Sequence, residues 1–591
     1  MNNTIISFAL LSLVLVPLLS SLGLLFANNL VYVRNIGIVS SVVTFGISLF
    51  LWGFHTPFDP YFAIDPLNFS FLREDYYIFF ADGISTLFVV LTSFLIPICL
   101  LSIQGTVDRE KEYSAALLLL QGFIHCIFLI PNVFLFYIFF ESVLIPMYFI
   151  IGVMGSRLRR IYAAYMLVLY TLFGSVPMLL AILYLYAVFG TFDYFQLVTL
   201  LNLDTVCLSD ETKRLLWLAF FMGFAVKVPM VPFHIWLPEA HVEAPTAGSV
   251  ILAGILLKIG TYGLLRYSIP FFKEASLYFS PMVYVLSCIA IVYTSLTTLR
   301  QIDLKKIVAY SSVAHMGYVT MGLFSLTTTG VAGAILIMIS HGFVSSALFL
   351  CIGVVYDRYK TRIYKYYSGI AQFMPAFTII FLIFTMANLG LPGTSSFPGE
   401  FLVILGTFEV NALAAIIAVF GTILSAAYAL WMFNRVSFGA LKSTYISTLS
   451  DINTREFFFL FPLLLATIFF GVYPNYILNA IHLDLDHLLS IGPSPRDMIH
   501  TICTMEDISK FSFSTHVDSY AELKNYLRSQ DFLKEFFIHV RSGKIHRIVP
   551  LDETDEIVSR FQNTYFFKYK TFAAINNGGD KTLARYSICQ C

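Results

Sequence analysis

The sequence predicts an all-α protein that crosses a membrane about fourteen times, and two observations indicate this fold class. Of its 591 residues only 12% are charged while 58% are hydrophobic, and the mean hydropathy is +0.79. Soluble domains carry about 25% charged residues, so this chain lacks the side chains to cover a wetted surface. In addition, apolar runs of about 18 to 25 residues recur along the chain, and each is long enough to cross the hydrocarbon core of a bilayer.

The apolar runs follow one another as far as about Tyr473. They lack the two-residue alternation of barrel strands, so each is predicted to be a helix, the other structure that satisfies its backbone in lipid. The first run has no basic residues before it and no cleavage site after it, and we expect it to remain as a membrane helix. The expected spans are 5–26, 32–53, 82–103, 113–130, 132–153, 162–189, 212–233, 246–269, 279–299, 306–325, 330–355, 373–404, 411–434 and 456–474.

Basic residues between the spans predict the orientation. Basic loops face the negatively charged compartment, so the connections after odd-numbered spans are expected in a cytoplasm or mitochondrial matrix, and both termini on the opposite, proton-rich side. Connections after even-numbered spans carry only Arg73, Lys213, Arg214 and Lys273. Those after odd-numbered spans carry Arg34, Arg109, Lys111, Arg157, Arg159, Arg160, Arg300, Lys305, Lys306, Arg358, Lys360, Arg362, Lys365 and Arg435.

The last part of the chain has a different composition. After Gly492 about a quarter of the residues are charged, as in soluble domains. Apolar residues at helical intervals between Val517 and Val540 predict an amphipathic helix. Residues 493–591 are therefore expected to form a peripheral module or partner-binding extension, and their role is not readable from the sequence.

Several function classes find no support in the sequence. The net charge is zero and the pI about 7.2, so no basic field predicts a nucleic-acid partner. The eight cysteines include no CxxC pair, which argues against disulfide scaffolding and iron–sulfur ligation. His241 and Glu243 resemble the start of a zinc-deaminase motif, but no Pro-Cys-x-x-Cys follows. We expect neither a metal site nor a bound redox cofactor.

Ionisable residues inside the expected spans are the candidate functional residues. Each costs about 2.5–3.5 kcal/mol at the centre of a membrane helix, so each suggests a function. Singly, each also fits a structural role: an ion pair between two helices, a neutral histidine bonded to a neighbour, or a carboxylate capping a broken helix. As a set they exceed what maintaining the fold needs. They are Glu141, Lys227, Lys258, His315, His341 and Glu400.

The chemistry of this set is suited to proton relay. A lysine shielded from water holds its proton less tightly, and a nearby carboxylate reverses that effect. If Glu141 and Lys227 approach each other, a change in their separation would switch Lys227 between holding and releasing a proton. Histidine titrates near neutrality and can pass protons between its two ring nitrogens.

Two predicted helix breaks accompany these residues. Pro229 and Pro232 follow Lys227, and the segment from Gly390 to Pro398 precedes Glu400. Non-helical backbone at membrane depth must line protein or water, and repeated breaks point to an ion site. The breaks lie five spans apart, which predicts two five-helix repeats. The expected parts are residues 1–110 (spans one to three), 111–270 and 271–437 (the two repeats), 438–492 (the last span) and 493–591 (the extension).

Several stretches resemble a known family. The run AVKVPMVPFHIWLPEAHVEAPTAGSV, from Ala225 to Val250, resembles the signature of the antiporter-like membrane subunits shared by respiratory complex I and multisubunit cation/proton antiporters. Four further stretches closely resemble the chain 4 family of NADH:ubiquinone oxidoreductase, and the resemblance covers about residues 80 to 475. They are Phe140–Met147, Ile251–Arg266, Asp303–Gly317 and Gly393–Phe401.

The resemblance implies a fold and residue roles. The family fold has fourteen transmembrane helices with two inverted five-helix repeats. Glu141 and Lys227 match its modulating carboxylate–lysine pair, and Lys258 its central lysine. The histidines that link the half-channels match His315 and His341. Glu400 matches the terminal acidic group, which stands where related subunits carry lysine.

The resemblance also implies partners and location. Such a chain would supply one proton channel of the complex, beside neighbouring antiporter-like subunits. FMN, iron–sulfur clusters and ubiquinone would be bound elsewhere in that complex, with no redox centre in this chain. The sequence of Gly155–Tyr165 and the 59 Phe and 34 Tyr residues resemble those of mitochondrial members of the family. This implies a multi-pass protein of the mitochondrial inner membrane with both termini in the intermembrane space. The charged extension departs from the family pattern.

Two alternatives remain open at this point. The chain could be a subunit of a stand-alone cation/proton antiporter, since that family shares the Lys227 region. Glu400 in place of lysine argues against it. The chain could also be a scaffold with an inactive channel, whose buried charges only hold helices together.

Overall fold

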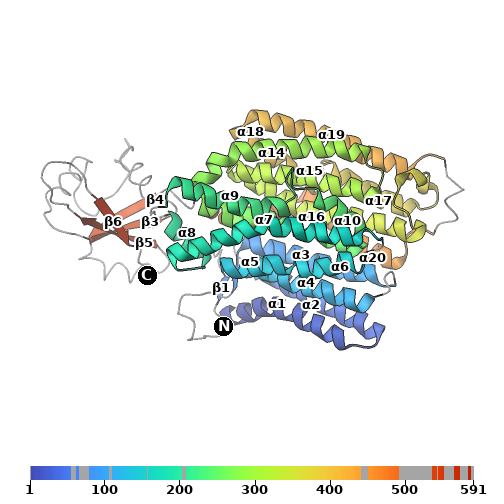
Figure 1. Ribbon diagram of the computed structural model, residues 1–591, viewed down its shortest axis with the longest axis horizontal. Helices are drawn as coiled ribbons and strands as arrows, with labels where there is room; N and C mark the ends of the chain where they lie inside the picture. The colour runs from blue at the N-terminus through green and yellow to red at the C-terminus, as the bar shows by residue number, and fades with distance from the viewer. Residues whose placement is uncertain are drawn as a thin grey trace. The chain divides into compact units, whose positions relative to one another are not determined.

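The computed structural model describes residues 2–54, 62–64, 79–105, 109–155, 157–202, 208–440 and 450–490, and four strands between 535 and 587. The chain divides into two compact units near Gly492. The first unit is a helical bundle, which confirms the predicted fold class (Figure 1). Its first half contains α1 (Asn2–Phe26), α2 (Leu30–Phe54), α3 (Gly83–Ile103), α4 (Glu110–Leu129), α5 (Val133–Ser142), α6 (Leu144–Gly152), α7 (Arg160–Phe189), α8 (Tyr194–Asn202) and α9 (Asp210–Lys227), with a short hairpin of β1 (Phe62–Ile64) and β2 (Phe79–Ala81).

The bundle continues through helices that include two π-helical segments. These are η1 and η2, which flank a short α-helix and form with it one continuous span. The elements are α10 (Trp236–Glu243), α11 (Thr246–Ile251), η1 (Leu252–Leu256), α12 (Leu257–Gly263), η2 (Leu264–Ser268), α13 (Ile269–Phe271), α14 (Lys273–Arg300), α15 (Leu304–Phe324), α16 (Thr328–Tyr359), the 3₁₀ turns η3 (Tyr364–Tyr366) and η4 (Ile370–Gln372), α17 (Pro375–Asn388), α18 (Ser396–Val410), α19 (Ala412–Ser437), α20 (Thr454–Val472) and α21 (Asn475–Ser490).

Within the described residues, 12 helical segments are long and apolar enough to cross a membrane. Two further expected spans correspond to α9, which ends in a lysine, and to α17 and α18, which are separated by a break. The count of fourteen and the two inverted repeats stay predictions, as do the boundaries of the predicted parts.

Burial separates the central helices from those at the edge. Every residue in the most apolar window of α16 and of the α11–α13 span is buried, against 33% for α1 and for α2. In Figure 1, α1 and α2 lie along one edge of the bundle, α14, α18 and α19 along the other, and α16 between them. A helix that is apolar all round is either central or faces lipid. Both kinds occur here: Lys258, His315 and His341 lie on central helices, whereas Glu400 lies on α18 at the edge.

The described strands of the extension form an antiparallel sheet in the order β4-β3-β5-β6. The strands are β3 (Glu535–Arg541), β4 (Lys544–Pro550), β5 (Tyr565–Phe572) and β6 (Leu583–Ser587). The amphipathic helix predicted over 517–540 is therefore wrong from Glu535 onward, and the remainder lies outside the described residues. Aromatic and β-branched residues, which favour strands, fill the sequence of β3 and outweigh its helical spacing.

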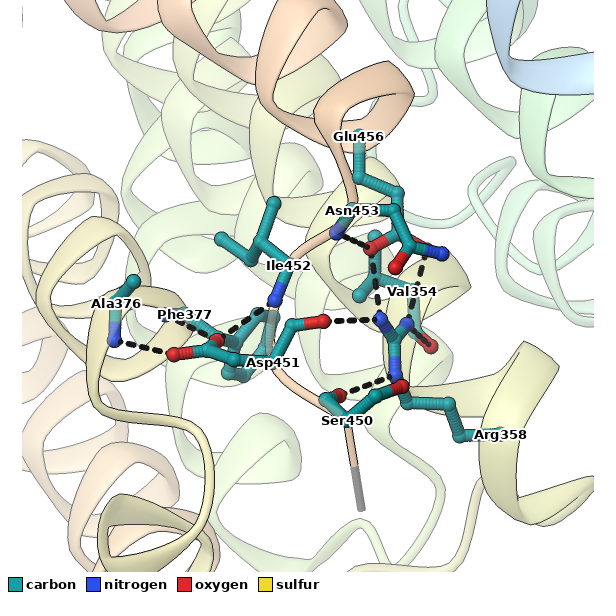
Figure 2. A network of polar contacts seen from close by, with 9 residues as sticks. All are labelled: Val354, Arg358, Ala376, Phe377, Ser450, Asp451, Ile452, Asn453 and Glu456. Atoms are coloured by element: carbon teal, nitrogen blue, oxygen red, sulfur yellow. Dashed lines mark hydrogen bonds and ion pairs between the residues drawn. The ribbon is translucent and has the colours of Figure 1, made fainter.

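A partly exposed arginine ties α16 to the start of α20 (Figure 2). Arg358 donates two hydrogen bonds to the carboxylate of Glu456, at 2.9 and 2.8 Å. It also donates to the carbonyl oxygens of Ser450 and Asp451, both at 3.0 Å. The Asp451 carboxylate accepts from the backbone amide of Ala376 at 2.9 Å, in the first turn of α17. One guanidinium therefore fixes the ends of three helices.

We predict that Arg358→Ala lowers the amount of assembled protein, because it leaves the Glu456 carboxylate buried without its partner. Breaking a buried ion pair in this way costs about 3–5 kcal/mol. Native gel electrophoresis of solubilised membranes measures the loss, and Arg435→Ala, which removes an exposed arginine from α19, should leave assembly near normal. Equal assembly of the two variants would contradict the stabilising role.

Candidate functional site

The first helix break places Lys227 at the end of α9. The following residues cannot continue the helix, because Pro229 has no amide hydrogen to donate and its ring clashes with the preceding turn. Lys227 is 4% exposed. Its Nζ donates to the carbonyl oxygen of Phe140 at 2.5 Å and lies 3.1 Å from the centroid of the Phe140 ring. The ammonium group is thus held against α5.

Glu141 follows Phe140 directly, so the predicted pair is brought to neighbouring positions. The carboxylate lies within electrostatic range of Lys227. Its two oxygens are buried and have no hydrogen-bond partner among the described residues. The carbonyl group of Phe140, and not the carboxylate, accepts the hydrogen bond from Lys227. The pair is adjacent but not joined in this arrangement.

Lys258 lies at the centre of the bundle, fully buried on α12 between the two π-helical segments. Its Nζ donates to the carbonyl oxygen of Ala253 at 2.5 Å and lies 2.8 Å from Nδ1 of His341. A π-helical turn has the i→i+5 spacing that Ala253 and Lys258 also show, and such turns are frequent at functional sites. The π-helical segment η1 therefore lies where a backbone carbonyl group stabilises the buried ammonium group of Lys258.

A line of ionisable groups continues from His341 to Glu400. The rings of His341 on α16 and His315 on α15 have centroids 5.7 Å apart. Nδ1 of His315 lies 3.6 Å from Oε1 of Glu400, and His315 also hydrogen-bonds to Asn388 at the end of α17. All of the ionisable groups in this line are buried. The structure thus brings together Lys258, His341, His315 and Glu400 from four different helices.

The second helix break makes room for the Glu400 carboxylate. Gly390 adopts a φ of +77°, and a Cβ at this position would lie within 2.4 Å of Oε2 of Glu400. Gly393, in the same break, has a φ of +91° and no atom within 4 Å of a built Cβ. Both glycines supply left-handed backbone, but only Gly390 also gives space to the carboxylate.

Two functional candidates were missed from the sequence. His241 on α10 is fully buried, stacks on Phe349 at 4.5 Å, and lies within electrostatic range of both Lys258 and Lys305. Lys305 is 3% exposed on α15, and its Nζ donates to the carbonyl oxygen of Ala244 at 2.8 Å. The sequence analysis placed Lys305 in the connection before the span 306–325, which is wrong, because it is buried in the first turn of α15. The available signal was Asp303, because aspartate favours the N-cap position and so places the helix start before Lys305.

Comparison with known proteins shows which class of membrane protein shares this fold. Residues 131–425 match the family model described as NADH:quinone oxidoreductase/Mrp antiporter, TM. Respiratory complex I from Thermus thermophilus with bound NADH contains a similar chain, with a TM-score of 0.73 and 29% identity over 82% of this chain and 99% of that one. The Mrp complex from Dietzia contains another, with a TM-score of 0.74 but 19% identity over 84% and 99%, which shows the fold alone. The chain is an antiporter-like membrane subunit.

Relatives narrow the class to one family. NADH-ubiquinone oxidoreductase chain 4 of Marchantia polymorpha is 53% identical over 492 residues, or 81% of this chain and 97% of the relative. The Arabidopsis thaliana protein of the same name is 53% identical over 489 residues, or 82% and 98%. The chain therefore belongs to the NADH-ubiquinone oxidoreductase chain 4 family, and the family predicted from the sequence is confirmed. It is a multi-pass membrane subunit of that enzyme.

We predict that Gly390→Ala impairs the enzyme more than Gly393→Ala does. Both substitutions strain a left-handed backbone, but only the first pushes a methyl group into the Glu400 carboxylate. Overpacking of this kind costs about 1–3 kcal/mol. The readout is coupled NADH:ubiquinone turnover per assembled complex in membrane vesicles. Equal loss in both variants would mean that the space beside Glu400 does not matter.

Proposed function

We propose that this chain translocates protons across the mitochondrial inner membrane, as a membrane-arm subunit of complex I that is driven by NADH-to-ubiquinone electron transfer elsewhere in the complex. The observation that carries the proposal is the 2.8 Å contact between Lys258 Nζ and His341 Nδ1, in a line that continues through His315 to Glu400. Buried acids and bases placed in sequence are what proton transfer requires.

In the proposed transfer, Lys258 donates one of its ammonium protons to Nδ1 of His341, and the imidazolium then releases its proton from the other ring nitrogen. His315 receives the proton and passes it toward Glu400. The 3.6 Å between His315 and Glu400 exceeds the length of a hydrogen bond. This link must therefore shorten, or be bridged by water, before the proton moves, which makes it a point where transfer can be controlled.

Glu141 and Lys227 would control loading of the central lysine. A carboxylate close to Lys227 stabilises its charge, and separation of the two weakens that stabilisation. In the arrangement described above, Lys227 is bonded to the carbonyl group of Phe140, which supports the idea that it can exchange one partner for another. The charge on Lys227 would then alter the tendency of Lys258 to release its proton.

The two alternatives predict different behaviour. An antiporter subunit would exchange a metal cation for protons, but the likeness to the Mrp chain is 19% in sequence, against 53% to chain 4 relatives. An inactive scaffold would need its buried charges to be paired, whereas Lys258 contacts a histidine and a carbonyl group but no carboxylate within the described residues. The redox-driven proton channel explains both facts.

The remaining parts of the proposal concern the setting of the chain. We place both termini in the intermembrane space and expect neighbouring antiporter-like subunits as partners within the lipid bilayer. We expect no redox cofactor or metal in this chain, since FMN, iron–sulfur clusters and ubiquinone would be bound by other parts of the complex. Nucleic acid is not an expected partner. The role of residues 493–591 stays open.

We predict that Lys258→Gln lowers the proton-to-electron ratio of assembled complex reconstituted in proteoliposomes, because glutamine keeps the length of the side chain but cannot release a proton. Lys360→Gln, which neutralises an exposed lysine at the end of α16, should leave the ratio unchanged. Normal assembly with an unchanged ratio in Lys258→Gln would support the scaffold instead.

A further inference from the structure

A second buried cluster of charges lies where α3 begins, outside the line described above. Asp82 is the N-cap of α3, and its Oδ1 accepts from the amide of Ser85 at 2.7 Å. Its other oxygen, Oδ2, accepts a hydrogen bond from Nη1 of Arg266 at 2.6 Å. Both partners are buried, at 1% and 7% exposure. The charge of Arg266 is therefore already matched by Asp82.

A third member of the cluster, Asp484, comes from α21. This helix follows the last span and is not among the membrane-spanning helices. It packs against α3 and α16 through a buried face that includes Ile481, Asp484 and Leu485, while His482 is exposed. Asp484 is 3% exposed, and its carboxylate faces the backbone amides of Gly83 and Ile84 in the first turn of α3.

The cluster thus contains two carboxylates and one guanidinium. Arg266 can fully compensate only one of them, and a second buried carboxylate is costly in its ionised form, so the second acid is more stable with a proton. Burial first, and then the charge of Asp82, raise the pKa of Asp484. Arg266 and the first amides of α3 oppose that rise. The helix α16 also packs against α21, and its only titratable residues before Tyr356 are His341 and Cys351.

The cluster is connected to the central lysine along one helical segment. Lys258, Tyr262 and Arg266 follow one another at intervals of four residues, which places them on one side of the segment about 12 Å from end to end. The Tyr262 hydroxyl is buried and donates to the carbonyl oxygen of Phe128 at 3.3 Å. A row of polar groups therefore leads from Lys258 to Arg266.

We propose that Asp484 is a proton-exchanging residue of this chain, which holds a proton beneath α21 beside the Asp82–Arg266 ion pair. On release, the O–H bond of Asp484 breaks and the proton leaves toward the face of the bundle that α21 covers. The remaining carboxylate is then stabilised by Arg266 and by the amides at the start of α3. The assignment rests on the proposed function and adds a residue outside the spans to it.

The test uses the intact wild-type complex in native membranes. Dicyclohexylcarbodiimide, an apolar reagent, modifies carboxyl groups that are protonated in apolar surroundings, and fragment mass spectrometry locates the adducts. We expect an adduct on Asp484 that decreases as the pH is raised from below to above neutrality. Asp82, held by Arg266, and Asp486, which is 47% exposed and paired with His482 at 3.1 Å, serve as internal controls and should show several-fold less. Absence of the adduct on Asp484, or equal labelling of Asp486, would overturn the proposal.

Matched variants test whether the proton on Asp484 is used. Asp484→Asn keeps the shape of the side chain and removes the exchangeable proton, while Asp486→Asn makes the same change on the exposed side of α21. The first should lower the proton-to-electron ratio and the second should not, and equal ratios would overturn the role in transfer. If Lys258→Gln lowers the ratio while Asp484 is not labelled, only the assignment of Asp484 fails. If Lys258→Gln leaves the ratio unchanged, the proposed function itself fails.

Discussion

The constraint on which the fold depends is the cost of placing an ammonium group in the middle of a bundle surrounded by lipid. Lys258 meets it with two partners, the carbonyl oxygen of Ala253 and Nδ1 of His341. The first requires a carbonyl group within reach of the lysine at an i→i+5 position, beside the π-helical turn η1. The second requires α16 to run through the centre of the molecule, where its apolar residues are fully buried. The helix that supports the lysine is therefore also the core of the bundle.

The two helix breaks each make a place for a charged side chain inside the bundle, but they do so in different ways. At the first, Pro229 ends α9 and leaves Lys227 at a helix terminus, where its side chain can reach α5. At the second, Gly390 supplies both a left-handed turn and the space that the Glu400 carboxylate occupies. Pro229 thus positions the ammonium group of Lys227, and Gly390 leaves space for the carboxylate of Glu400. In both cases the interruption of regular structure determines where a charge can lie.

Much of the bundle could be predicted from the sequence, because length and hydropathy alone specify a membrane helix. The candidate residues Lys258, His315, His341 and Glu400 were found in the same way, as charges in apolar surroundings. Their order in space could not be predicted, since it depends on which faces of α15, α16 and α18 meet. For the same reason the sequence could not tell that Lys227 would bind the carbonyl group of Phe140 rather than Glu141. Asp484 was missed because it lies in an amphipathic helix, where an acid is expected on the exposed face until its burial is seen.

The most direct test of the central claim is a density map of the assembled complex that resolves ordered water around α12, α15, α16 and α18. The account predicts an unbroken series of hydrogen bonds, made by side chains and water, that joins Lys258, His341, His315 and Glu400. Water between His315 and Glu400 would bridge the 3.6 Å separation seen in this structure. Apolar side chains that fill the space between these groups, with no water among them, would contradict a proton path and leave the buried charges with a structural role alone.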